Sequence, residues 1–196
     1  MASNKKKARK LHATIVFADE SGFSLVPFVA KTWAIRGQTP IVRHAFRWPK
    51  ISAISGLTTR NQLLFMVVDG SIGGAECQRF LIHLVRHVKG PIIMIWDNNR
   101  PHKSDEVKEV VISSHGSLML EFLPPYAPEI NPDEGLWSYL KTHELANKCV
   151  KDTKELSQEV RRAVARTRHR SGLVQGILRG TPLCMDGLLT QLCRHQ

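Results

Sequence analysis

Three carboxylates, Asp19, Asp97 and Glu134, stand where apolar segments of the chain end. Asp19 follows the run TIVFA and Asp97 follows PIIMIW, and both runs have the length and composition of buried strands. Glu134 comes after the strand-like LMLEFL and the segment FLPPYAPEINP, where an amphipathic helical pattern begins. Clustered carboxylates repel one another unless a hard cation lies between them, and Mg²⁺ prefers oxygen ligands. If the fold gathers these three acids, metal-dependent phosphodiester chemistry becomes available.

The acids before Trp137 also have a purely structural interpretation. Asn131 suits a helix N-cap and Pro132 the first helical position, while Glu134 could complete a capping box. Both Asp133 and Glu134 would then face the positive end of the helix. Taken alone, this structural role is the more common one, so the rest of the chain has to decide between the two interpretations.

The order of apolar patterns predicts an α/β domain with a meander and helical crossovers. Strands are expected at 12–23, 31–35, 51–57, 62–74, 91–98 and 118–123, and helices at 75–88, after Ser104, after Pro132 and after Asp152. A right-handed crossover allows the strands that end in Asp19 and Asp97 to lie side by side and parallel. We therefore expect both carboxylates at one edge of the sheet. We divide the chain into a flexible basic arm (1–11), a catalytic core (12–147) and a C-terminal helical extension (148–196).

The chain is strongly basic, with 28 Lys and Arg against 17 Asp and Glu and a net charge of +11. Such a charge attracts polyanions, and nucleic acid is the natural partner. No apolar run approaches the roughly 20 residues that span a bilayer, and MASNKKKARK lacks the apolar segment of a secretory signal. We expect a cytoplasmic, nucleoid-associated protein with no membrane partner.

Cysteine and histidine spacing indicates no metal site by itself. The four cysteines are scattered without a CxxC pattern, so we expect free thiols. His83 and His87 lie four residues apart on a predicted helix but lack a third ligand nearby in sequence, so a solvated face is expected. The arginines between 161 and 170 are equally compatible with a solvated face and with a surface that faces DNA.

Three segments resemble the catalytic blocks of the mariner superfamily of cut-and-paste transposases, in its bacterial insertion-sequence branch. They are FADESGF, WDNNRPHKS and FLPPYAPEINPDEGLWSYLK, and KTWAIRGQTP is similar to the block that follows the first acid. The resemblance covers Ile15 to Leu145. It implies an RNase H-like fold, with a mixed five-stranded sheet flanked by helices. It also implies that Asp19, Asp97 and Glu134 are catalytic and bind two Mg²⁺ ions, for which Mn²⁺ substitutes, to cleave element ends and join them to target DNA.

The chain departs from the family pattern at a few positions. The third block of the family reads Asn-Pro, an apolar residue and Glu, whereas Asp133 occupies the apolar position here and leaves open which acid reaches the metal. His102 matches a frequent family histidine, which we assign to DNA contact, with a loop-ordering or plain structural role as the alternatives. Further nonspecific phosphate contacts are expected from basic residues of the segment after the first block, namely Lys31, Arg36, Arg43, Arg47 and Lys50.

Full-length family members carry N-terminal helix-turn-helix modules, whereas a basic decapeptide precedes the first strand here. We therefore expect the second frame of a split transposase, an isolated catalytic domain or a remnant, with a separate helix-turn-helix polypeptide or upstream frame supplying sequence recognition. The resemblance also implies self-association as a dimer. The alternative function is that of an inactive transposase remnant that only binds DNA.

Overall fold

The computed structural model describes residues 2–38, 40–41, 49–124 and 128–181. Its centre is one mixed five-stranded sheet with the strand order β3-β2-β1-β4-β5. The strands are β1 (Thr14–Ser24), β2 (Lys50–Thr58), β3 (Leu63–Asp69), β4 (Ile92–Trp96) and β5 (Leu118–Phe122). The pairs β1–β2 and β2–β3 are antiparallel, whereas β4 runs parallel to both β1 and β5. The predicted α/β fold with a mixed five-stranded sheet is confirmed.

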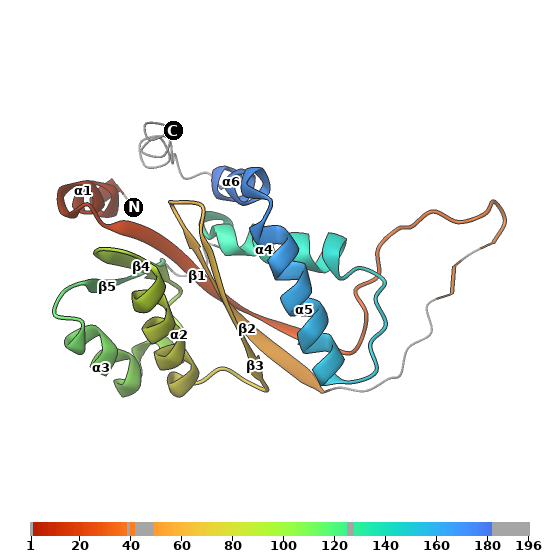
Figure 1. Cartoon of the computed structure of the whole chain (residues 1–196), viewed down its shortest axis with the longest axis horizontal. Helices are drawn as coiled ribbons and strands as arrows, with labels where there is room; N and C mark the ends of the chain where they lie inside the picture. Colours follow the sequence, from red (N-terminus) through yellow and green to blue (C-terminus); the bar gives the residue numbers. More distant parts are fainter. Residues whose placement is uncertain (1, 39, 42–48, 125–127, 182–196) are drawn as a thin grey trace.

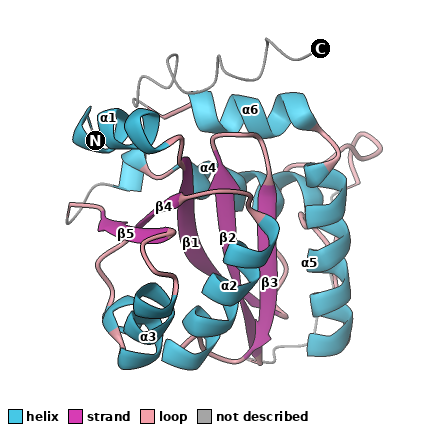
Figure 2. Cartoon of the chain, turned by 60° about the vertical axis from the view of Figure 1, so that its left-hand side comes forward, coloured by secondary structure: helices cyan, strands magenta, loops and turns pink. Residues whose placement is uncertain are grey.

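Helices cover both faces of this sheet (Figure 1). The helices are α1 (Ala2–Leu11), α2 (Gly74–His87), α3 (Asp105–Ser113), α4 (Pro132–Tyr139), α5 (Thr153–Arg168) and α6 (Ser171–Arg179). On one face, α2 and α3 pack on a core that includes Phe80 and Trp96. On the other face, α4, α5 and α6 pack on a second core that includes Phe17 and Trp137. Figure 2 shows the sheet between these two layers.

The burial of the strands follows from their position in the sheet. All five residues of β4 are buried because helices cover both of its faces, which is why its sequence is continuously apolar. In β1, Val16 and Ala18 belong to the core under α2, while Ile15 and Phe17 belong to the core under α4. Side chains alternate along a strand, so the two positions after Ala18 face opposite sides of the sheet.

Two expectations about the first fifty residues need correction. Residues 2–11 form α1 instead of the flexible arm, because Ala8 is buried in the core and Lys7 forms a 2.9 Å ion pair with Glu121 of β5. Residues 31–35 form no strand: they belong to an excursion between β1 and β2 that extends away from the body (Figure 1), and Trp33 is fully exposed. The turn signal after them is real, since Gly37 adopts a φ of 85° and the amide of Gln38 donates to the carbonyl oxygen of Ile35.

The predicted helix caps are present. The Asn131 side chain accepts a hydrogen bond from the Asp133 amide at the start of α4, and the Asp152 side chain accepts one from the Glu155 amide at the start of α5. After α4 the helix widens into a π turn over Leu140–Glu144. Such a turn inserts one extra residue and redirects the chain.

Within the described residues, Cys77 and Cys149 are free thiols, as expected. The other two cysteines, Cys184 and Cys193, lie outside the described residues. No helix in the described part of the chain is both long and apolar enough to cross a membrane.

Candidate active site

The predicted first acid lies on β1, and the predicted second acid directly follows β4, the neighbouring parallel strand. The pairing of β1 with β4 ends at Phe17 opposite Ile95, and Asp19 and Asp97 each follow two residues later. Adjacent strands lie about 4.8 Å apart. Asp19 therefore stands beside the end of β4, where Asp97 begins the following loop. On its other side Asp19 pairs in register with Ser55 of β2.

Helix α4 is fixed over this part of the sheet by hydrogen bonds. The indole N–H of Trp137 donates to Oδ2 of Asp19 at 2.9 Å, and the Asn131 side-chain amide reaches the carbonyl oxygen of Ala18 at 3.5 Å. The hydroxyl of Ser55 donates to Asp133. The first turn of α4 consequently lies over β1 and β2, which brings the third acidic segment to the first acid.

The two adjacent acids of α4 have opposite environments. Asp133 is fully buried beneath the helix, and burial raises the pKa of its carboxyl well above the ordinary value although the hydrogen bond from Ser55 opposes this. Glu134 is exposed, and its charge is close enough to raise the pKa of Asp19. The buried Asp133 is thus a structural group of the helix start, whereas Glu134 offers a solvent-facing carboxylate whose charge reaches Asp19.

Asp19 lies in an environment that favours its neutral form. Burial and the neighbouring charge of Glu20 raise the pKa of Asp19 to about 7, with a further contribution from Glu134 and a partial reduction by the hydrogen bond from Trp137. A divalent cation bound beside Asp19 would remove this penalty by compensating the carboxylate charges. The available donors around it are carboxylate oxygens, which fit Mg²⁺ or Mn²⁺.

Asp97 is held by His102, which folds back under the end of β4. Nδ1 of His102 lies 2.6 Å from Oδ1 of Asp97, and Nε2 lies 3.0 Å from Oε1 of Glu20. Burial alone would lower the pKa of His102, but hydrogen bonds with Asp97, Cys77 and Glu20 raise it to about 11. Burial would also raise the pKa of Asp97, yet the hydrogen bond from His102, the charge of His102 and the hydrogen bonds from Asn99 together outweigh burial, so the pKa lies below its ordinary value. Asp97 therefore remains a carboxylate.

The predicted DNA-binding residues fall into three groups. Lys31, Arg36 and Lys50 are exposed, the first two on the excursion after β1. Arg43 and Arg47 lie outside the described residues. His102 is 2% exposed and both of its ring nitrogens face carboxylates, so the assignment of His102 to DNA contact is wrong and the loop-ordering role fits.

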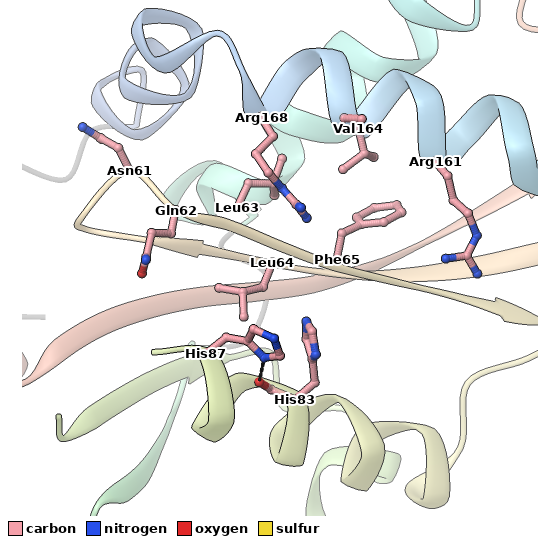
Figure 3. Close-up of a pocket in the computed structure, with 11 residues that line it drawn as sticks. Asn61, Gln62, Leu63, Leu64, Phe65, His83, His87, Arg161, Val164 and Arg168 are labelled. Carbon is pink, nitrogen blue, oxygen red and sulfur yellow. Dashed lines mark hydrogen bonds between the residues drawn. The ribbon is translucent and has the colours of Figure 1, made fainter. Parts of the chain in front are cut away.

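A basic groove of about 630 Å³ runs between α2, the start of β3 and α5 (Figure 3). His83 and His87 reach it from α2, and Arg161 and Arg168 reach it from α5, with apolar residues of β3 such as Phe65 between them. No carboxylate is among the described residues that line it. Burial and the neighbouring His87 and Arg168 lower the pKa of His83, so the groove offers an anionic ligand chiefly the guanidinium groups of Arg161 and Arg168.

The other arginines of α5 are engaged within the fold. Arg162 forms a 2.7 Å ion pair with Glu159, and Nε of Arg166 lies 2.7 Å from a carboxylate oxygen of Glu144. Of the arginines on α5, the two that line the groove, Arg161 and Arg168, are therefore the candidates for a surface that faces DNA.

Sequence reasoning missed the residues that hold the acids in place. Glu20, Trp96 and His102 form one hydrogen-bonded unit, in which the Trp96 indole donates to Glu20 at 2.9 Å and stacks on the His102 ring with centroids 3.8 Å apart. The strand period gave a signal, because Glu20 and Trp96 alternate with the neighbouring acids and so must face the other side of the sheet. No comparable pattern in the sequence indicated that Trp137 would contact Asp19, since its position predicted only an apolar residue of the helix.

A profile of the family described as DDE superfamily endonuclease matches residues 14–157. Among solved structures, the Mos1 strand transfer complex aligns at a TM-score of 0.66 with 20% identity, over 96% of this chain and 57% of that chain. The mariner Mos1 paired-end complex with Mg aligns at 0.62 with 20% identity, over 95% of this chain and 58% of that chain. The catalytic domain of Mos1 mariner transposase aligns at 0.56 with 17% identity, over 91% of this chain and 88% of that chain.

These structural likenesses establish the fold, which is the RNase H-like fold expected for the sheet and its flanking helices. The chain spans a little under three fifths of the length of the transposases in the two complexes. No curated protein matches the sequence.

Proposed function

The chain belongs to the DDE superfamily endonuclease family, and we propose that it is the catalytic domain of a transposase that cuts DNA strands and transfers them to a target. The observation that carries this proposal is the position of three acids from three separate elements. Asp19 lies on β1 and Asp97 directly follows β4, the neighbouring parallel strand. Helix α4 is tied to Asp19 by the Trp137 hydrogen bond, and the charge of Glu134 is close enough to raise the pKa of Asp19. We assign these three carboxylates as catalytic residues and metal ligands.

We propose that the site binds two Mg²⁺ ions, for which Mn²⁺ can substitute. Bound between such carboxylates, these ions supply activation of a water or a 3′-hydroxyl and stabilisation of the leaving oxygen. The raised pKa of Asp19 supports the assignment, because burial and the neighbouring charges of Glu20 and Glu134 disfavour the carboxylate, and a bound cation would compensate this penalty. A relative with the same fold was crystallised with Mg.

The residues around the proposed metal site have different roles. Asp97 stays ionised through its pairing with His102, and Trp137 orients Asp19 through its indole hydrogen bond. Glu134, on the exposed side of the first turn of α4, faces the solvent from which DNA arrives. Asp133 anchors that turn to β2 and takes no metal.

The proposed partners are element ends and target DNA. The net charge of +11 and the groove lined by Arg161 and Arg168 support DNA binding through phosphate contacts. Lys31, Arg36 and Lys50 would add contacts from the side of the excursion.

The proposal also places the chain in the bacterial insertion-sequence branch and in the cytoplasm, associated with the nucleoid. It further includes self-association as a dimer and a separate helix-turn-helix recognition unit. The partial coverage of longer transposases supports a recognition unit outside these residues. The division into residues 1–11, 12–147 and 148–196 also stays a proposal.

The test is nicking of supercoiled plasmid DNA by the purified chain in Mg²⁺ or Mn²⁺. Activity that requires the metal and is lost in Asp97→Asn supports the proposal. Binding of DNA without any cleavage in either metal, by a folded chain with its recognition unit supplied, would favour the inactive remnant instead.

A further inference from the structure

Three side chains with metal-ligating atoms meet on the face of the sheet opposite Asp19. They are Glu20 of β1, Cys77 of α2 and His102 of the loop after β4, and their ligand atoms all lie within 4.8 Å of one another. Cys77 and His102 are buried, and the Glu20 side chain is 18% exposed. We propose that this cluster is a binding site for Zn²⁺, separate from the carboxylates assigned to the catalytic ions.

The ring of His102 is already oriented as a metal ligand. Its Nδ1 faces Asp97 at 2.6 Å, which leaves Nε2 directed at Glu20 at 3.0 Å and beside Cys77. Histidine ligands commonly donate the second ring N–H to a carboxylate, which fixes both tautomer and orientation. The stacked ring of Trp96 holds the imidazole plane from one side. The geometry around His102 therefore supplies the supporting shell of a metal site as well as its ligand.

The donor set selects the ion. A thiolate sulfur, an imidazole nitrogen and one carboxylate oxygen suit the borderline-soft Zn²⁺, whereas Mg²⁺ takes oxygen ligands. Tetrahedral zinc with bonds of about 2.0–2.3 Å separates its ligand atoms by roughly 3.3–3.8 Å. The observed separations, from 3.0 Å up to 4.8 Å, lie around this range, so small side-chain shifts close the site.

A cavity of about 280 Å³ opens next to the cluster and is lined by Glu20 and His102 together with Ser52 and Ser71. It supplies a path for the ion and space for a water as the fourth ligand. The Cys77 thiolate and the Glu20 carboxylate together would compensate the charge of one divalent ion, so the buried site would hold no uncompensated charge.

The site connects to the proposed active site through a single imidazole. Zinc at Nε2 would hold the His102 ring, and the ring in turn holds Asp97 through Nδ1. The sequence concealed this cluster because its three members come from a strand, a helix and a loop, with no ligand spacing between them.

Co²⁺ serves as the spectroscopic probe, since a thiolate ligand gives an intense charge-transfer band that an oxygen-only site lacks. The protein is a chain with Cys149, Cys184 and Cys193 replaced by serine, so that Cys77 is its one remaining cysteine. Titration with Co²⁺ in excess Mg²⁺ is expected to give the band with a stoichiometry of one, and Zn²⁺ is expected to abolish it. His102→Gln should weaken Co²⁺ binding about 10- to 100-fold.

Cys77→Ser in the same background is the matched control and should remove the band while circular dichroism confirms the fold. Glu134→Gln should leave the band unchanged, so failure of the zinc proposal and failure of the proposed transposase activity are distinguished. The proposal is overturned if the folded parent shows no band, or if the band persists in Cys77→Ser.

Discussion

The indole N–H of Trp137 donates a 2.9 Å hydrogen bond to Oδ2 of Asp19 and thereby ties α4 to the centre of the sheet. Its ring packs between Phe23 and Phe65, each with its centroid 6.0 Å away. Trp137 thus positions the helix that carries Glu134, and it also orients Asp19. A mutation at this position separates the two roles, because phenylalanine keeps much of the packing and loses the donor.

Trp137→Phe is expected to weaken Mg²⁺ binding several-fold. In the parent chain, the hydrogen bond from Trp137 lowers the pKa of Asp19. Its loss favours the protonated carboxyl, from which a metal must first displace the proton. The loss of one hydrogen bond should also reduce the free energy of unfolding by about 0.5–1.5 kcal/mol. Mg²⁺ titration followed by isothermal calorimetry measures the first effect. Trp33→Phe is the matched control, since Trp33 is fully exposed and should change neither quantity.

Stabilisation by Mg²⁺ should grow as the pH rises through about 7. The folded-state pKa of Asp19 is raised from 3.8 to about 7, so without metal its contribution to stability is present below pH 3.8 and is lost as the pH rises through 7. Bound metal restores that loss, and at low pH it must first displace the proton. The Tm increase on adding Mg²⁺ should therefore be larger at pH 8 than at pH 5.5. An increase that is equal at both pH values would argue against Asp19 as a ligand.

The adjacent acids of α4 should differ sharply on substitution by their amides. Asp133→Asn is expected to keep DNA nicking within about 10-fold of the parent, because burial already favours the neutral form of the carboxyl and the amide keeps an oxygen acceptor for Ser55. Glu134→Gln should lose about 10³-fold, because the amide removes a carboxylate that would hold the metal, and the metal supplies several kcal/mol of transition-state stabilisation. Rates on supercoiled plasmid measure both. The reverse order would move the third acid to Asp133.

The basic groove should contribute to the affinity for DNA of any sequence. Arg161→Ala with Arg168→Ala removes the two groove arginines, and the slope of log K against log salt should fall by about 2. The matched control is Arg162→Ala with Arg166→Ala, which removes two arginines of the same helix that are paired with Glu159 and Glu144. Fluorescence anisotropy with duplex DNA at several salt concentrations gives both slopes. Equal slopes for the two double variants would exclude a specific role of the groove.

Local patterns predicted most of the fold because each element carries its own signal. The run PIIMIW required a strand covered on both sides, and the caps Asn131 and Asp152 start helices where the sequence placed them. The strand predicted for KTWAI is absent because this segment has no partner strand in the described residues. Its β-type composition is not sufficient, since tertiary position decides strand formation more than propensity does.

The sequence predicted those site residues whose place at the end of a strand also determines where they lie in space. Acids at strand ends are visible in sequence, and the parallel pairing of β1 with β4 brings Asp19 and the start of the Asp97 loop together. The difference between Asp133 and Glu134 depends on which side of one helical turn meets Ser55, and the sequence contains no such information. The cluster of Glu20, Cys77 and His102 depends in the same way on contacts between elements distant in sequence.

The central claim is that acids from β1, the loop after β4 and α4 surround one metal site, and iron-directed protein cleavage tests it most directly. Fe²⁺ replaces Mg²⁺ in oxygen sites, and with ascorbate and peroxide it cuts the polypeptide next to the bound ion. In the Cys77→Ser chain, we expect cuts near Asp19, Asp97 and Glu134, all suppressed together by Mg²⁺. Cuts at only one or two of these positions, or cuts that Mg²⁺ fails to suppress, would contradict a shared metal site.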